Sequence, residues 1–205
     1  MKHLGRPCAG LLALTLSSCF FELAPLQEGE ADAGSSTKQV IAPGAVWRYL
    51  DTGSAPASWN QPSFDDSGWD SGAAELGYGD GDEATVVGYG SNADSKYITT
   101  YFRHEFDSPF GTVTAARLEV VRDDAVVVYV NGTQAFLDNL PATFNASTPS
   151  LTAIAKEAEA QFIPGQLDPK LFVKGKNVVA VEIHQEGATS TDISFDLALT
   201  LDGSP

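Results

Sequence analysis

The segment with the clearest chemistry is an acidic, glycine-spaced stretch, Leu76-Gly77-Tyr78-Gly79-Asp80-Gly81-Asp82-Glu83. Asp80, Asp82 and Glu83 supply three carboxylates close together, and the glycines between them let backbone carbonyl oxygens turn toward the same point. Hard oxygen ligands of this kind bind calcium. The twelve-residue spacing of an EF-hand loop is absent, and acidic loops on an acidic protein are often only solvated. The sequence therefore offers a structural calcium ion at these three residues as a hypothesis.

A second set of residues has the chemistry of carbohydrate binding. Sugars are bound by an exposed aromatic face that packs on C–H groups and by planar polar groups that contact hydroxyls. The alternative is structural: Asp123 and Asp124 satisfy turn amides, and Arg122 pairs with them. His184 shares a strand face with Glu182, so it is expected to be the histidine that meets solvent. The candidate ligand-binding residues are Trp59, Tyr78, Arg122, Asp123, Asp124, His184 and Gln185.

Signatures of catalysis are missing from the sequence. It contains no Gly-x-Ser-x-Gly elbow, no His-Glu-x-x-His pair and no Walker loop. His104 alternates with Phe102 and Phe106 in a β-type pattern, which indicates a hydrogen-bonded core histidine. The many acidic residues make any single pair of carboxylates uninformative for glycosidic chemistry. We therefore expect a protein that is not an enzyme.

The element that positions these residues is the run Asp123 to Phe136, which is rich in valine and is interrupted by Asn131-Gly132. β-branched and aromatic residues favour a strand, and Asn-Gly tolerates the positive φ angles of a tight hairpin turn. Because Val126, Val127 and Val128 leave neither face polar, this strand is expected to be covered on both sides. That environment is typical of a central strand in a two-sheet sandwich.

The rest of the chain after residue 40 also has the pattern of a β protein. A short helix is expected only near residues 153–160. Many strands, glycine-rich turns and little helical periodicity predict an all-β fold, a two-sheet sandwich, in preference to a closed barrel. The other expected strands are Ala45–Asp51, Tyr97–Phe106, Thr112–Val121, Val178–Gln185 and Ile193–Leu201.

The first residues have the pattern of a secretion signal. Lys2 and Arg6 precede an apolar run, and Leu16-Ser17-Ser18-Cys19 closes it. This closing motif resembles a bacterial lipobox, which implies cleavage before Cys19 and a lipid on its thiol; the alternative is an ordinary signal cut near Ser18. The expected organisation is a signal peptide over residues 1–18, a lipidated cysteine with a disordered tether over 19–39, and one domain over 40–205. Phe20 resembles the residue found in outer-membrane lipoproteins.

The charge and the cysteines restrict the partners. The formal net charge is −15, which disfavours nucleic acid and anionic lipid as partners. The only cysteines are Cys8 and Cys19, so the predicted mature domain has no disulfide or thiolate metal site. We expect membrane contact through the lipid alone, and the composition leaves the oligomeric state open.

Four motifs together resemble a known fold family. They are Phe64-Asp65-Asp66-Ser67-Gly68-Trp69, Tyr101-Phe102-Arg103, the run from Asp124 to Gly132, and the run from Gly175 to Glu182. The combination resembles galactose-binding-like jelly rolls, and in particular the sugar-binding domain of family-two glycoside hydrolases. The acidic loop followed by Tyr97 to Arg103 is similar to jelly-roll modules appended to secreted bacterial phosphoesterases. The resemblance implies a jelly-roll β-sandwich, and in this class a structural calcium is common.

These observations lead to one expected function with two alternatives. The chain is expected to be a lipid-anchored, extracytoplasmic jelly-roll module without catalysis, which binds a carbohydrate or cell-surface glycan through loops at one end of the sandwich. The first alternative is a structural or assembly spacer that has no small ligand. The second is an uncharacterised secreted hydrolase or an accessory subunit of one. One fold of this kind serves many tasks, so the choice depends on the site.

Overall fold

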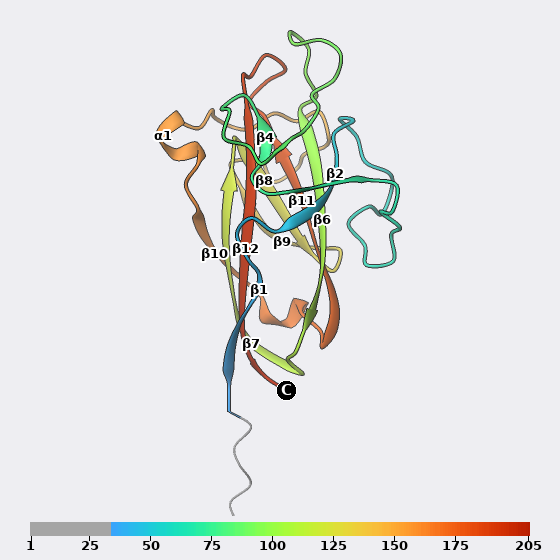
Figure 1. Cartoon of the computed structure of the whole chain (residues 1–205), viewed down its shortest axis with the longest axis vertical. Helices are drawn as coiled ribbons and strands as arrows, with labels where there is room; N and C mark the ends of the chain where they lie inside the picture. Colours follow the sequence, from blue (N-terminus) through green and yellow to red (C-terminus); the bar gives the residue numbers. More distant parts are fainter. Residues whose placement is uncertain (1–33) are drawn as a thin grey trace, which may run out of the picture. The chain divides into compact units, whose positions relative to one another are not determined.

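The computed structural model of the chain describes residues 34–205 and contains two six-stranded β-sheets (Figure 1). In the first sheet the strand order is β10-β7-β12-β4-β5, and β1 also pairs with β12. All pairs in this sheet are antiparallel except β4 with β5. Its strands are β1 (Ser36–Ile41), β4 (Leu76–Tyr78), β5 (Thr85–Val86), β7 (Thr112–Arg122), β10 (Ile163–Leu167) and β12 (Ile193–Ser204).

The second sheet is antiparallel throughout and has the order β3-β2-β6-β11-β8-β9. Its strands are β2 (Val46–Leu50), β3 (Asp70–Ala73), β6 (Thr99–Ser108), β8 (Ala125–Val130), β9 (Thr133–Asp138) and β11 (Gly175–His184). Within the described residues the only helices are α1 (Lys156–Glu159) and the single 3-10 turn η1 (Pro169–Leu171). The predicted all-β, two-sheet sandwich is therefore confirmed, and the predicted short helix is present as α1.

The valine-rich run forms β8, one strand in from the edge of its sheet, as its composition predicts. Asn131 and Gly132 have φ angles of 50° and 84°, so the turn between β8 and β9 has the two positive values expected of Asn-Gly. Val126 and Val128 pack into the main core between the sheets. Val127 faces the other side and packs with Leu140, Leu137 and Phe144. The outer face of β8 is thus covered by the segment that follows β9 and not by a further sheet.

The core between the sheets is built from alternating inward residues of facing strands. Phe102 of β6 and Phe195 of β12 stack with ring centroids 4.2 Å apart, and Trp47 of β2 meets the edge of Phe195 at 4.9 Å. In the final strand every second residue, from Ile193 to Leu201, is buried in this cluster. Burial of large apolar side chains is the main stabilising term for a domain of this size.

The N-terminal boundary of the domain lies earlier than expected. β1 begins at Ser36 and pairs with β12 through Ser36↔Gly203 and Gln39↔Thr200, so the expectation that the tether extends to residue 39 is wrong. The first four residues of β1 are exposed and polar, so they have no apolar periodicity that would predict a strand. They form a strand because their backbone pairs with β12. The predicted signal peptide, the lipidated Cys19 and the first part of the tether lie outside the described residues.

Over residues 34–205, no helix has both the length and the apolar character needed to cross a bilayer.

Candidate metal and ligand site

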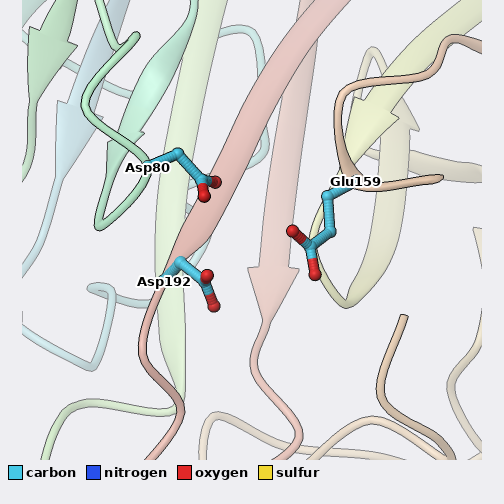
Figure 2. Close-up of side chains that lie close together, drawn as sticks. All are labelled: Asp80, Glu159 and Asp192. Carbon is cyan, nitrogen blue, oxygen red and sulfur yellow. The ribbon is translucent and has the colours of Figure 1, made fainter. Parts of the chain in front are cut away.

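Three carboxylates from distant parts of the chain meet at one end of the sandwich. Asp80 follows β4, Glu159 ends α1 and Asp192 precedes β12, and one oxygen from each lies within 4.8 Å of the others. Figure 2 shows the three side chains converging from separate segments. Like charges at this distance repel each other, so a cation would stabilise the arrangement.

The pairing of β4 with β12 brings two of these residues together. Tyr78 is opposite Ile193, so the loops that leave the two strands start side by side. Gly79, between Tyr78 and Asp80, has a φ of +113°, and a Cβ atom there would lie 2.7 Å from Asp192. Only glycine allows so close an approach. The loop is then held by Glu83, whose carboxylate accepts hydrogen bonds from the backbone N–H groups of Asp80 and Gly81, both at 3.0 Å.

Glu159 is the most buried member of the cluster, at 9% exposure. Burial raises the pKa of its carboxyl, and the charges of Asp192 and Asp80 raise it further. One cation lies nearby: Lys156, whose Nζ is 3.4 Å from Asp80 Oδ1. That side chain is 80% exposed, so it screens the cluster only weakly.

Asp123 and Asp124 lie directly beside the cluster and have different roles. The carboxylate of Asp124 accepts hydrogen bonds from the backbone N–H groups of Ile154, at 2.7 Å, and Glu186, at 2.6 Å, so it ties two loops together. Asp123 is 2% exposed, and its Oδ2 has no hydrogen-bond partner. Burial raises the pKa of Asp123 to about 9, and Asp124, Glu159 and Asp192 add to the effect. A hydrogen bond between the side chains of Asp123 and Asp124 contributes as well, so the cost of burial falls on the ionised form of Asp123.

Two hollows open over these residues. One, of about 360 Å³, is lined by Asp123, Glu159 and Asp192 together with the hydroxyl-bearing residues 189–191. The other, of about 180 Å³, is lined by Asp80, Asp82 and Glu159. Glu159 and Lys156 line both. This end of the sandwich thus combines carboxylates and hydroxyl groups in spaces that a cation or a sugar-sized ligand can enter. The residues that could hold a metal ion are Asp80, Glu159 and Asp192, with Asp123 beside them.

The acidic loop contributes only one of its three predicted metal ligands to this cluster. Asp80 belongs to it, whereas Glu83 is turned back to its own backbone and Asp82 is exposed. The carboxylate oxygens that converge are those of Asp80, Glu159 and Asp192, while calcium binding at Asp80, Asp82 and Glu83 stays a prediction. No local motif could identify Glu159 and Asp192, because they lie 79 and 112 positions further along the chain.

Most of the predicted ligand-binding residues gather near this end but are buried. Tyr78 is 5% exposed, Gln185 2% and His184 0%. The expectation that His184 meets solvent is wrong, since its Nδ1 lies 2.9 Å from Thr148 O and 3.0 Å from Thr99 Oγ1, and its Nε2 lies 2.9 Å from Glu182 Oε2. The segment after β9 folds over this ring, and Phe144 contacts its face.

The other two predicted ligand residues are engaged in structural contacts. Trp59 is 9% exposed and packs with Trp69 and Tyr101 in a separate cluster on the second sheet, so its ring is not free to stack on a sugar. Arg122 pairs with Asp138, at 2.8 Å, and not with Asp123 or Asp124. The structural alternative is confirmed for Asp124, which does satisfy backbone amides.

His104 is half-buried, with its Nδ1 2.8 Å from Val46 O and its ring 5.1 Å from that of Trp47. Burial lowers its pKa. The hydrogen bond expected of His104 is present, but the side chain is half-buried and does not belong to the core, so the expectation of a core histidine is confirmed only in part.

Comparison with known proteins finds likeness in structure only. No family model matches the chain, and no curated protein sequence matches it. Among solved structures it is similar to a β-glucuronidase from glycoside hydrolase family 2 (16% identity, TM-score 0.47, 82% of this chain and 18% of that one). It is also similar to a Bifidobacterium dentium β-glucuronidase complexed with coumarin-3-O-glucuronide (18% identity, TM-score 0.45, 73% of this chain and 20% of that one). A family 2 member from Bacteroides cellulosilyticus matches at 13% identity and a TM-score of 0.49, over 82% and 20%.

The chain spans about a fifth of the length of these enzymes. At these identities and TM-scores the likenesses carry no argument about activity, ligand or metal. Two of the three are family-two glycoside hydrolases, the class whose sugar-binding domain the sequence motifs resemble. The sandwich architecture is established by the strand order and register of this chain, independently of these comparisons.

Proposed function

We propose that residues 34–205 form a non-catalytic carbohydrate-binding module whose loop end holds one calcium ion. The observation that carries this proposal is the convergence of three carboxylates beside buried Asp123, whose pKa two of them help to raise to about 9. A divalent cation would offset the repulsion among them and take the place of the proton on Asp123. Calcium fits best because every side-chain ligand offered is an oxygen and the site has room for several more, from hydroxyls or water.

The carbohydrate part of the proposal rests on what the larger hollow presents. Its carboxylates accept hydrogen bonds from sugar hydroxyls, and a bound cation can coordinate hydroxyls directly. The neighbouring loop carries Tyr97, which is 39% exposed, and the same loop is tied to the rim by Lys96, whose Nζ donates to Ser190 O at 2.6 Å. Binding without catalysis is favoured because both histidines of the domain have structural partners.

We expect calcium to stabilise the protein through this site. At a calcium concentration about ten times Kd, stability rises by about 1.4 kcal/mol, which moves the thermal midpoint of a domain this size by roughly 3–5 °C. Asp192→Asn removes one carboxylate of the cluster and should abolish most of that rise. Asp94→Asn, at an exposed position of a loop that contributes no carboxylate to the cluster, is the matched control and should respond like the wild type. The measurement is a thermal melt in EDTA and in millimolar calcium.

The function is tested on the same proteins with a glycan array followed by calorimetry. We expect saturable binding to a carbohydrate in calcium, with loss of binding in EDTA and in Asp192→Asn. Binding that is unaffected by both would place the sugar elsewhere and contradict the role of the loop end. An array without any signal, together with self-association in solution, would favour the spacer alternative.

We further propose that the module is held outside the cytoplasm by a lipid on Cys19. The support is the lipobox-like Leu16-Ser17-Ser18-Cys19 and the apolar run before it. Expressed in a bacterium, the full chain should enter the detergent phase, and Cys19→Ser should remain in the aqueous phase. A Cys19→Ser protein found in the detergent phase would contradict the anchor.

A further inference from the structure

A third hollow, of about 360 Å³, opens on the second sheet and shares no residue with the acidic hollows. It is lined by residues of β2, β3 and β6 and by Asp66 of the turn before β3. Its polar lining differs from that of the loop end, because it includes two arginines, Arg48 and Arg103, on a protein whose net charge is strongly negative. Any inference from this hollow is therefore independent of the proposed cation site.

Arg103 is fully buried and is only partly satisfied. Its Nε donates to Asp66 Oδ2 at 2.7 Å, and its Nη1 donates to the backbone oxygens of Trp59 and Gln61. Its Nη2 is buried and has no hydrogen-bond partner. An unmade hydrogen bond at a buried, charged donor is expensive, so an oxygen brought by a ligand would be favoured there.

Arg48 lies directly across from Arg103 in the pairing of β2 with β6. The side chain is exposed, and its one hydrogen bond is from Nη1 to Trp69 O at 3.2 Å. Asp66 is the only carboxylate paired with either arginine, since Glu105 pairs with Lys176 at 2.8 Å. Two guanidinium groups lie on adjacent strands, and one carboxylate, that of Asp66, pairs with Arg103. The unpaired guanidinium of Arg48 offers a positive charge and forked donors, which suit a planar carboxylate.

The same hollow also presents hydrogen-bond acceptors. His104 follows Arg103 in β6, so its side chain points to the opposite face and packs on Trp47, and it is not among these acceptors. Ser71 adds a hydroxyl, and Asp66 Oδ1 is a second acceptor. Acceptors of this kind can receive hydrogen bonds from hydroxyl groups, whereas an anion without hydroxyl groups has no donor to offer them.

We propose that this cleft binds a small organic carboxylate that carries hydroxyl groups, the chemistry of a sugar acid. The carboxylate lies between Arg48 and Arg103, and the hydroxyls face Ser71 and Asp66. Val46, which is 60% exposed, contributes the apolar part of the wall. A multiply charged anion is disfavoured by the formal charge of −15.

The test titrates galacturonate, galactose and inorganic phosphate into the full folded domain in EDTA, followed by NMR or calorimetry. Galacturonate should bind with at least tenfold higher affinity than either of the other two. Arg48→Ala should weaken galacturonate binding at least tenfold, as expected for a charge-assisted hydrogen bond. Lys38→Ala removes an exposed cation from β1 of the other sheet and should change nothing.

Arg103→Lys keeps the charge but loses the fork, and it should also weaken binding at least tenfold. Because this substitution alters a buried side chain and can unfold the protein, the decisive variant is Arg48→Ala, at an exposed position. The proposal is overturned by equal galacturonate binding in Arg48→Ala, by equal affinity for galactose or phosphate, or by no saturable binding up to about 50 mM. Asp192→Asn should leave galacturonate binding intact, so failure here is distinguishable from failure of the cation site.

Discussion

Replacing His184 by alanine should lower the free energy of unfolding by about 3–5 kcal/mol. His184 is 0% exposed, and its partner Glu182 is 6% exposed, with Nε2 and Oε2 2.9 Å apart. Without the ring, Glu182 keeps one partner, the Tyr129 hydroxyl at 3.1 Å, and its charge stays buried. The carbonyl oxygen of Thr148 also loses the contact that closes the covering segment over the sheet. The measurement is urea unfolding at constant pH.

The control for this prediction is a second pair that involves β11 and is exposed. Lys176 and Glu105 lie 2.8 Å apart with side-chain exposures of 66% and 42%, so Lys176→Ala should give no measurable change. The double variant Glu182→Leu/His184→Leu tests the cause. If the cost arises from the uncompensated charge, the double variant is more stable than His184→Ala. A His184→Ala protein as stable as the wild type would show that the pair has no structural role.

The same histidine shows why the site was harder to predict than the fold. The turn at Asn131-Gly132 and the double burial of β8 follow from residues adjacent in sequence, and both are as predicted. His184 alternates with Ile183 as a solvent-facing residue would, yet Phe144 and Thr148 cover it. Strand periodicity reports which face a residue is on, but it cannot report that an irregular segment folds over that face.

The carboxylate cluster was beyond sequence reasoning for a different reason. Asp80 was identified because glycines and acids surround it, whereas Glu159 lies in a single helical turn and Asp192 in a loop, without any local signature. The three meet only because β4 pairs with β12 and because Asp124 ties the loops of Ile154 and Glu186 together. Long-range register places these groups, and register is not visible in composition or spacing.

The stability of the metal-free protein should fall as the pH rises from about 5 to 8, and Asp123→Asn should remove much of that dependence. The pKa of Asp123 is raised to about 9 in the folded protein, from an ordinary value near 3.8, by burial and by Asp124, Glu159 and Asp192. Between these two values the folded state holds a proton that the unfolded state has released. Unfolding then releases a proton, so the free energy of unfolding declines with pH in this window.

Asparagine keeps the shape of the protonated side chain and cannot ionise. In EDTA the gain in stability from Asp123→Asn should therefore be small near pH 5 and about 4 kcal/mol larger near pH 8. Glu159 and Glu75, whose pKa values are also raised by burial, are present in both proteins and contribute with the same sign to each. Urea unfolding at the two pH values measures the difference. A variant that is less stable than the wild type at pH 8 would mean that the Asp123 carboxylate is favourably held in the folded protein.

Calcium separates this electrostatic cost from a purely steric effect of the substitution. If Asp123 is costly because four carboxylates, Asp80, Asp123, Glu159 and Asp192, share one end of the sandwich without a cation, calcium should stabilise the wild type more at pH 8 than at pH 5. Asp123→Asn has no proton to release, so its response to calcium should vary less with pH. Asp123, which destabilises the metal-free domain when it is ionised, would then also make cation binding depend on pH, because the cation takes the place of its proton.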